Sequence, residues 1–190
     1  MLQWLKNLTY KIEERAAKSK LIYRIASRYY KKVIQKESAL ANITSDDHVL
    51  CIGGGICPFS AILFHQITKA KVTVIDNNCD CIPKAKQVIN GLNLSNFVRV
   101  LHADGESINL EGYSVIHLAL QVSPIEKVFA KIQDESTPGA RILMRRPKKH
   151  LDKLYCKMSR NSLKYGAYAA HKSRNIGSTL LFTIQEEIFA

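Results

Sequence analysis

Apolar residues recur at helical spacing through the first 42 residues of the chain. One run covers residues 2–18. A second run begins after Ser19 and repeats apolar residues at intervals of three and four through residue 34. Ser19 is suited to cap this second run, because its hydroxyl can accept a hydrogen bond from a backbone N–H. The pattern predicts a pair of amphipathic helices or one broken helix, ending near Asn42.

From residue 48 onward, short apolar runs alternate with helical patterns. The runs predict strands at His48–Ile52, Lys71–Ile75, Val98–Leu101, Tyr113–Leu120 and Arg141–Met144. The patterns between them predict helices at Pro58–Gln66, Asp80–Gly91 and Pro124–Ile132, then a helical stretch after Pro147 to about Leu163 and a last, antiparallel strand at Thr179–Ile184. Such alternation is typical of an α/β fold. We predict a Rossmann-like, doubly wound, mostly parallel sheet in an α/β domain (43–190) that follows an N-terminal helical arm (1–42).

Composition narrows the class of protein. With 190 residues, 46% of them hydrophobic, the chain can build one full-sized core. No apolar run approaches the roughly 20 residues that span a bilayer, and the N-terminus lacks the pattern of a secretory signal. We therefore expect a soluble, cytoplasmic protein.

The cysteines and charges exclude some functions and leave others open. Five cysteines, an odd number, argue against a disulfide framework, and Cys79-x-Cys81 has the wrong spacing for zinc, so we predict no metal site. The net charge of +12 divides into +7 over residues 1–40, −3 over 41–140 and +8 over 141–190. Basic flanks of this kind bind phosphates or anionic membranes, or simply keep a protein in solution.

The stretch CIGGGICPFSA, residues 51–61, places a glycine turn directly after the first predicted strand. In a doubly wound sheet, ligands bind beyond the carboxyl ends of the strands. Asp76 ends the second predicted strand, where a carboxylate can accept from ribose hydroxyls, and Asp104 follows the third, where it can accept from an adenine amino group. Together these signals predict a nucleotide-type cofactor.

Details of the turn select among cofactors. The third glycine of the dinucleotide pattern is replaced by Cys57, Pro58 opens the next helix, and no Walker lysine follows. An adenosyl cofactor without a pyrophosphate fits best, and we predict S-adenosylmethionine (SAM). The residues expected to bind it are Gly53, Gly54, Gly55, Asp76, Asn77, Asp104, Gly105 and Leu120.

The same residues resemble a known family. VLCIGGG is similar to motif I of class I SAM-dependent methyltransferases, and GGGICPFSA looks more specifically like the nicotianamine synthase group. Further similar segments are Tyr29-Tyr30, Glu37-Ser-Ala-Leu40, VTVIDNN, HADGESI and Ile142-Leu-Met-Arg145, so the resemblance covers about residues 27–187. It implies a SAM-binding fold and, for nicotianamine synthases, transfer of the 3-amino-3-carboxypropyl group with release of methylthioadenosine. That family also carries a longer N-terminal helical domain that supplies an acidic group; only about 26 residues precede the similar region here.

The reaction stays open between two transfers. Methyl transfer is slightly favoured, because aminocarboxypropyl transfer has to fold back and hold the arm of SAM without most of the helical domain. Tyr30 and Glu37 are the candidate catalytic residues, seven apart on one helical face, with Glu37 as a base or as a partner of the SAM amino group. Gln121 and Ser123 are candidates on the acceptor side, and Arg145-Arg146 for a carboxylate or phosphate.

Several partners remain compatible with the sequence. We expect a small-molecule acceptor with a nitrogen or oxygen nucleophile. An RNA methyltransferase that uses the basic flanks is an alternative, although no base-amine motif follows the fourth strand. The N-terminal helices predict ordinary packing or a homodimer contact. A third class is a non-catalytic SAM-binding or membrane-associated partner protein, because Trp4 and the leucines around it suit a membrane interface.

Overall fold

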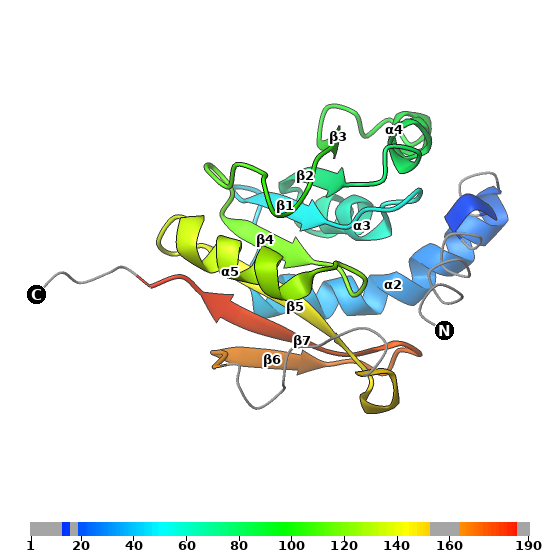
Figure 1. Cartoon of the computed structure of the whole chain (residues 1–190). Helices are drawn as coiled ribbons and strands as arrows, with labels where there is room; N and C mark the ends of the chain where they lie inside the picture. The colour runs from blue at the N-terminus through cyan, green and yellow to red at the C-terminus, as the bar shows by residue number, and fades with distance from the viewer. Residues whose placement is uncertain (1–12, 16–18, 153–163, 186–190) are drawn as a thin grey trace, which may run out of the picture.

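The computed structural model describes residues 13–15, 19–152 and 164–185 (Figure 1). Within them, one sheet of seven strands has the order β3-β2-β1-β4-β5-β7-β6. The strands are β1 (His48–Ile52), β2 (Lys71–Asp76), β3 (Val98–His102), β4 (Val115–Leu118), β5 (Arg141–Pro147), β6 (Ala167–Ala170) and β7 (Ile176–Thr183). Strands β1 to β5 run parallel to one another, whereas β7 is antiparallel to both β5 and β6. The predicted mostly parallel sheet is confirmed.

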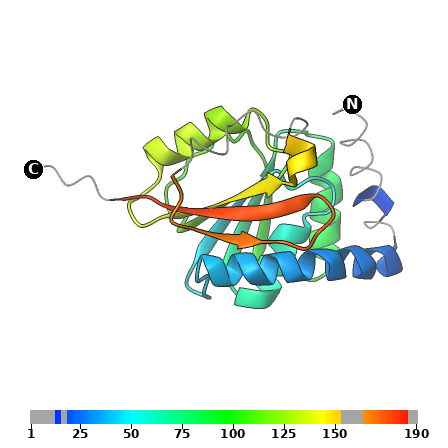
Figure 2. The ribbon, with the colours of Figure 1, turned by 90° about the horizontal axis from the view of Figure 1, so that it is seen from below.

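Helices cover both faces of the sheet, as a doubly wound fold requires (Figure 2). They are α2 (Lys20–Leu40), α3 (Phe59–Thr68), α4 (Cys81–Gly91) and α5 (Ile125–Glu135), with a short 3₁₀ turn, η1 (Lys149–Leu151). Apolar residues of α2, α3 and α4 form one core with one face of the strands, and α5 forms a second core with the other face. In Figure 2, α5 and α2 lie on opposite sides of the strands.

The central strands are buried on both faces. Every residue of β4 is buried, as are the last four residues of β1, which lies beside it. Side chains of successive residues point to opposite faces of a sheet, so a strand covered on both sides needs a continuous apolar run. This is why β1 has the bounds that its apolar run predicts.

Helix α2 packs one face against the α/β core. Its N-terminus begins after Ser19, whose hydroxyl accepts from the backbone N–H of Ile22 at 3.5 Å. Val33 and Ile34 are buried against the core, whereas Leu21 and Ile25 are exposed. The apolar pattern that we predicted for residues 2–18, Trp4 included, lies almost wholly outside the described residues.

Some elements differ from the predictions. β4 begins later than predicted because Ser114 lies in the preceding turn, where its hydroxyl accepts from the N–H of His48 and donates to Asp47. The strand also ends earlier than predicted, at Leu118. The edge strand β6 was not predicted, because four residues with alternating burial give too short a signal. Most of the helical stretch predicted up to Leu163 lies outside the described residues. No helix in the described part of the chain combines the length and apolar character needed to cross a membrane.

Two isoleucines of α2 test this packing. Ile34 is fully buried, whereas Ile25 is 64% exposed. We expect Ile34→Ala to lower the free energy of unfolding by about 2–5 kcal/mol, because it leaves a cavity in the core. Ile25→Ala, the matched control, should change it by less than about 0.5 kcal/mol. Urea denaturation measures both values, and equal losses would show that α2 does not pack as described.

Candidate functional site

A cavity of about 400 Å³ opens at the carboxyl edge of the sheet, beside β1 and β4. These two strands are neighbours, but the chain crosses over from β1 to β2 and β3 before it returns to β4, so this is the topological switch point. All eight residues predicted to bind the cofactor line this cavity: Gly53, Gly54, Gly55, Asp76, Asn77, Asp104, Gly105 and Leu120.

The glycine turn lies tightly against β2. The N–H groups of Gly53 and Gly54 both donate to the carbonyl of Ile75, at 2.9 and 3.0 Å. A Cβ atom on Gly54 would lie 2.4 Å from a methyl group of Val74, and Gly53 has a φ of +87°. The turn therefore needs glycine for both space and backbone conformation.

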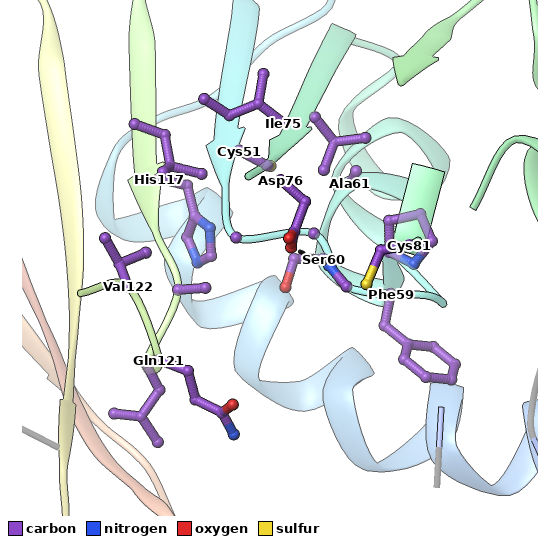
Figure 3. Close-up of a pocket in the computed structure, with 18 of the residues that line it drawn as sticks. Cys51, Phe59, Ser60, Ala61, Ile75, Asp76, Cys81, His117, Gln121 and Val122 are labelled. Carbon is purple, nitrogen blue, oxygen red and sulfur yellow. Dashed lines mark hydrogen bonds between the residues drawn. The ribbon is translucent and has the colours of Figure 1, made fainter. Parts of the chain in front are cut away.

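Hydrogen bonds fix the two strand-end carboxylates. Asp76 accepts from the N–H of Gly55 at 2.8 Å and from that of Asn78 at 2.9 Å. Asp104 accepts from the N–H of Glu106 at 2.9 Å. Figure 3 shows Asp76 and His117, from strands on opposite sides of β1, beside the turn, with Gln121 beyond His117.

Glu13 also lines the cavity, and the sequence analysis did not find it. Its carboxyl group accepts from the N–H of Ile56 at 3.0 Å, at the start of the turn into α3. The next residue, Glu14, pairs with Lys84 of α4 at 3.5 Å. Burial raises the pKa of Glu13 to about 8, and the nearby charge of Asp76 adds to the effect, although backbone N–H bonds oppose it.

Tyr30 lies at the side of the cavity that α2 covers. Its ring stacks on Phe59, with ring centroids 5.3 Å apart, and meets Tyr29 edge-on at 5.1 Å. Burial raises its pKa to about 12, and the charge of Glu13 contributes to this shift. Its hydroxyl is therefore protonated at neutral pH and can donate or accept a hydrogen bond.

The structure gives Glu37 a different environment from the one we expected. Its fully buried carboxylate does not line the cavity. Instead it accepts from Nε and Nη2 of Arg145, both at 2.8 Å, and from the hydroxyl of Thr179 at 2.6 Å. Burial alone would raise the pKa of Glu37, but the charge and hydrogen bonds of Arg145, together with His117 and the hydroxyl of Thr179, outweigh burial and lower the pKa to about 2. At neutral pH this carboxylate is an ion-pair partner, with no tendency to accept a proton.

The remaining candidates divide between two cavities. Gln121, Ser123 and Arg145 line the cavity at the glycine turn. Arg146 points to the other face of β5 and lines a separate cavity of about 520 Å³ beside β6. The pair Arg145-Arg146 therefore does not act at one place, because alternate residues of a strand face opposite sides.

His117 of β4 completes the lining of the first cavity. Its ring is fully buried and meets Phe64 edge-on at 5.3 Å. Within the described part of the chain, neither ring nitrogen has a hydrogen-bond partner. Burial, together with the charge of Arg145, lowers the pKa of His117 to about 3, so the imidazole is neutral at physiological pH.

Comparison with known proteins identifies the fold. No protein-family model matches the sequence, and no curated protein matches it. Among solved structures, a variant of the nicotianamine synthase MtNAS in complex with SAM is 23% identical, with a TM-score of 0.79 over 95% of this chain and 75% of that one. An RNA methyltransferase from Salinibacter ruber, in complex with S-adenosylhomocysteine, is 16% identical, with a TM-score of 0.68 over 83% and 93%.

A third similar structure is a SAM-dependent methyltransferase, described as putative, from Methanococcus maripaludis; it is 13% identical, with a TM-score of 0.64 over 86% of this chain and 88% of that one. At these identities the likeness is one of fold. The chain thus has the Rossmann-like fold of class I SAM-dependent methyltransferases, as its sequence predicted.

The raised pKa of Glu13 makes stability depend on pH. This carboxyl binds its proton more tightly in the folded chain (pKa about 8) than at its ordinary value of 4.5. Its contribution to stability is thus fully present below about pH 4.5 and is lost as the pH rises through about 8. We expect Glu13→Gln to leave Tm nearly unchanged at about pH 5 and to raise it, relative to wild type, at about pH 9.

Thermal denaturation at the two pH values measures this difference. Glu14→Gln is the matched control, because its partner Lys84 lies on α4 and its carboxylate does not line the cavity. It should shift Tm equally at both pH values. If the Tm difference between Glu13→Gln and wild type is the same at both pH values, the pKa of Glu13 is not raised in the folded chain.

Proposed function

We propose that this chain is a SAM-dependent transferase whose cavity binds SAM along the carboxyl edge of the sheet. The observation that carries the proposal is that a tight glycine turn and two fixed strand-end carboxylates meet at one cavity of suitable size. Asp76 would accept from the ribose hydroxyls and Asp104 from the adenine amino group. Proteins of the same fold that were crystallised with SAM or S-adenosylhomocysteine support the proposal.

The chemistry needs alignment and removal of one proton. When bound, SAM supplies a sulfonium whose three attached carbons are electrophilic. The protein has to hold the acceptor in line with one of them and take the proton of its amine or hydroxyl. We assign the removal of that proton to Glu13, because a general base works best when its pKa is near the operating pH. Tyr30 would orient the acceptor through its neutral hydroxyl.

Of the two transfers, we propose aminocarboxypropyl transfer, with methyl transfer as the alternative. The sequence favoured methyl transfer because it offered no candidate for the family's acidic group. Glu13 removes that objection, since its carboxyl group accepts from a backbone N–H of the turn and lines the cavity. The fold match to a nicotianamine synthase, which extends over 95% of this chain, supports the same choice.

We propose a small-molecule acceptor. The part of the cavity away from Asp104 is lined by the half-buried Tyr30, the buried His117 and the buried Arg145. Enclosed side chains of this kind suit a small polar ligand, whereas a nucleic acid needs an open basic surface.

Asp76 tests the cofactor site. We expect Asp76→Ala to weaken SAM binding by roughly tenfold to a hundredfold, the loss that corresponds to about 1.5–3 kcal/mol for hydrogen bonds to a charged group. Isothermal titration calorimetry measures the change. Asp80→Ala is the matched control, because Asp80 lies four residues further along and does not line the cavity. Full SAM affinity in Asp76→Ala would overturn the assignment.

The released nucleoside tests the reaction. We expect incubation with SAM and a cell extract to give methylthioadenosine, detected by mass spectrometry. Detection of S-adenosylhomocysteine would establish methyl transfer instead. If neither nucleoside is formed, the proposed transferase activity is contradicted. Glu13→Gln should slow product formation by roughly 10²–10⁴-fold, the usual contribution of a general base. Glu14→Gln should leave the rate unchanged.

A further inference from the structure

A buried cation faces the proposed acceptor part of the cavity. The guanidinium of Arg145 uses Nε and Nη2 to bind both oxygens of Glu37, each at 2.8 Å. Arg145 is only 7% exposed, and it lines the cavity. Among the described residues, none accepts a hydrogen bond from its third nitrogen, Nη1. A guanidinium held by two of its nitrogens thus keeps donors for a ligand.

The partners of Arg145 are themselves fixed. Glu37 is held from α2, and it also accepts from the hydroxyl of Thr179 on β7 at 2.6 Å. Thr179 is paired with Arg145 in the sheet register, so β7 helps to fix the carboxylate that holds the guanidinium. An arginine whose rotamer is fixed loses little entropy when it binds an anion.

A second donor lies near Arg145. The neutral ring of His117 lines the same cavity, and neither of its nitrogens has a hydrogen-bond partner in the described residues. A neutral imidazole carries one N–H donor and does not repel the guanidinium. Its Nε2 lies 3.6 Å from Glu37, which places the ring beside the ion pair.

The ion pair needs an explanation beyond stability. Taking two charges out of water is unfavourable, and apolar residues of similar volume often stabilise a core equally well. A buried pair that keeps part of its guanidinium at a cavity fits recognition of a planar anion better than it fits packing. A carboxylate matches the planar guanidinium in both shape and charge. An amine or a hydroxyl carries no negative charge to pair with it.

We propose that Arg145 binds the carboxylate of a ligand in this cavity, and that Glu37 and Thr179 position its guanidinium. The inference rests on the proposed function, which brings the carboxylate of SAM's amino-acid end to the site. A second carboxylate would be present if the small-molecule acceptor is itself an amino acid. Both present the same chemistry to Arg145 and His117.

Methylthioadenosine distinguishes the two sources, because it keeps the adenosyl thioether of SAM and lacks the carboxylate. We would measure the affinities of SAM and methylthioadenosine by calorimetry, and then titrate each common amino acid into protein saturated with methylthioadenosine. The key variant is the double substitution Glu37→Met and Arg145→Met, which removes both charges and leaves no unpaired ion in the core. Arg141→Met is the matched control on β5, since Arg141 pairs with Asp47 and does not line the cavity.

If the carboxylate is that of SAM, the double variant should lose roughly tenfold or more in SAM affinity and keep its affinity for methylthioadenosine. If the carboxylate is that of the acceptor, the double variant should keep its affinities for SAM and methylthioadenosine. It should no longer bind the amino acid that wild type binds. In either case Arg145→Lys should bind that ligand more tightly than the double variant does, because it keeps a positive charge. Glu37→Gln should bind the same ligand more weakly than wild type, because the guanidinium is held less firmly.

Two results would overturn the inference. If the double variant binds SAM, methylthioadenosine and amino acids as wild type does, the ion pair has a structural role only, and the proposed function stands. If wild type binds neither SAM nor methylthioadenosine, the proposed function fails, and this inference fails with it.

Discussion

The buried ion pair between Glu37 and Arg145 connects the parts of the chain that surround the cavity. It joins α2 to β5, and Thr179 extends the connection to β7. Removing one partner of such a pair leaves an uncompensated charge in the core, at a cost of about 3–5 kcal/mol. The helix that covers the cavity and the strand that supplies its cation are thus held in one arrangement.

A second constraint acts where the turn meets β2. Asp76 holds the N–H of Gly55, and Glu13 holds that of Ile56, so adjacent backbone donors bind two carboxyl groups. Burial, with a further contribution from the charge of Asp76, raises the pKa of Glu13 to about 8, so this carboxyl group is mostly protonated at neutral pH. Our proposal uses the ionised fraction of Glu13 as the base and Asp76 as the ribose partner.

The periodic parts of the fold could be predicted from the sequence. β1 has the bounds that its apolar run predicts, and the helices around it begin and end within a few residues of their predicted positions. The sequence also predicts that the glycine turn, Asp76 and Asp104 lie together at one edge of the sheet, and all three line the cavity. The reason is that the carboxyl ends of parallel strands share that edge. Local patterns carry this information, since burial on both faces requires continuous apolar strands.

The sequence by itself thus determined the class of fold, the place of the cavity and the residues at the glycine turn. The tertiary structure alone decided the chemistry around them. Glu13 reaches a backbone N–H 43 residues away, and Glu37 pairs with an arginine 108 residues away. The sequence suggested Glu37 as a base because helical spacing puts it on one face with Tyr30, but spacing cannot show which charge lies opposite. Contacts between distant residues leave no period in the sequence, and it is these contacts that fix burial, charge and pKa.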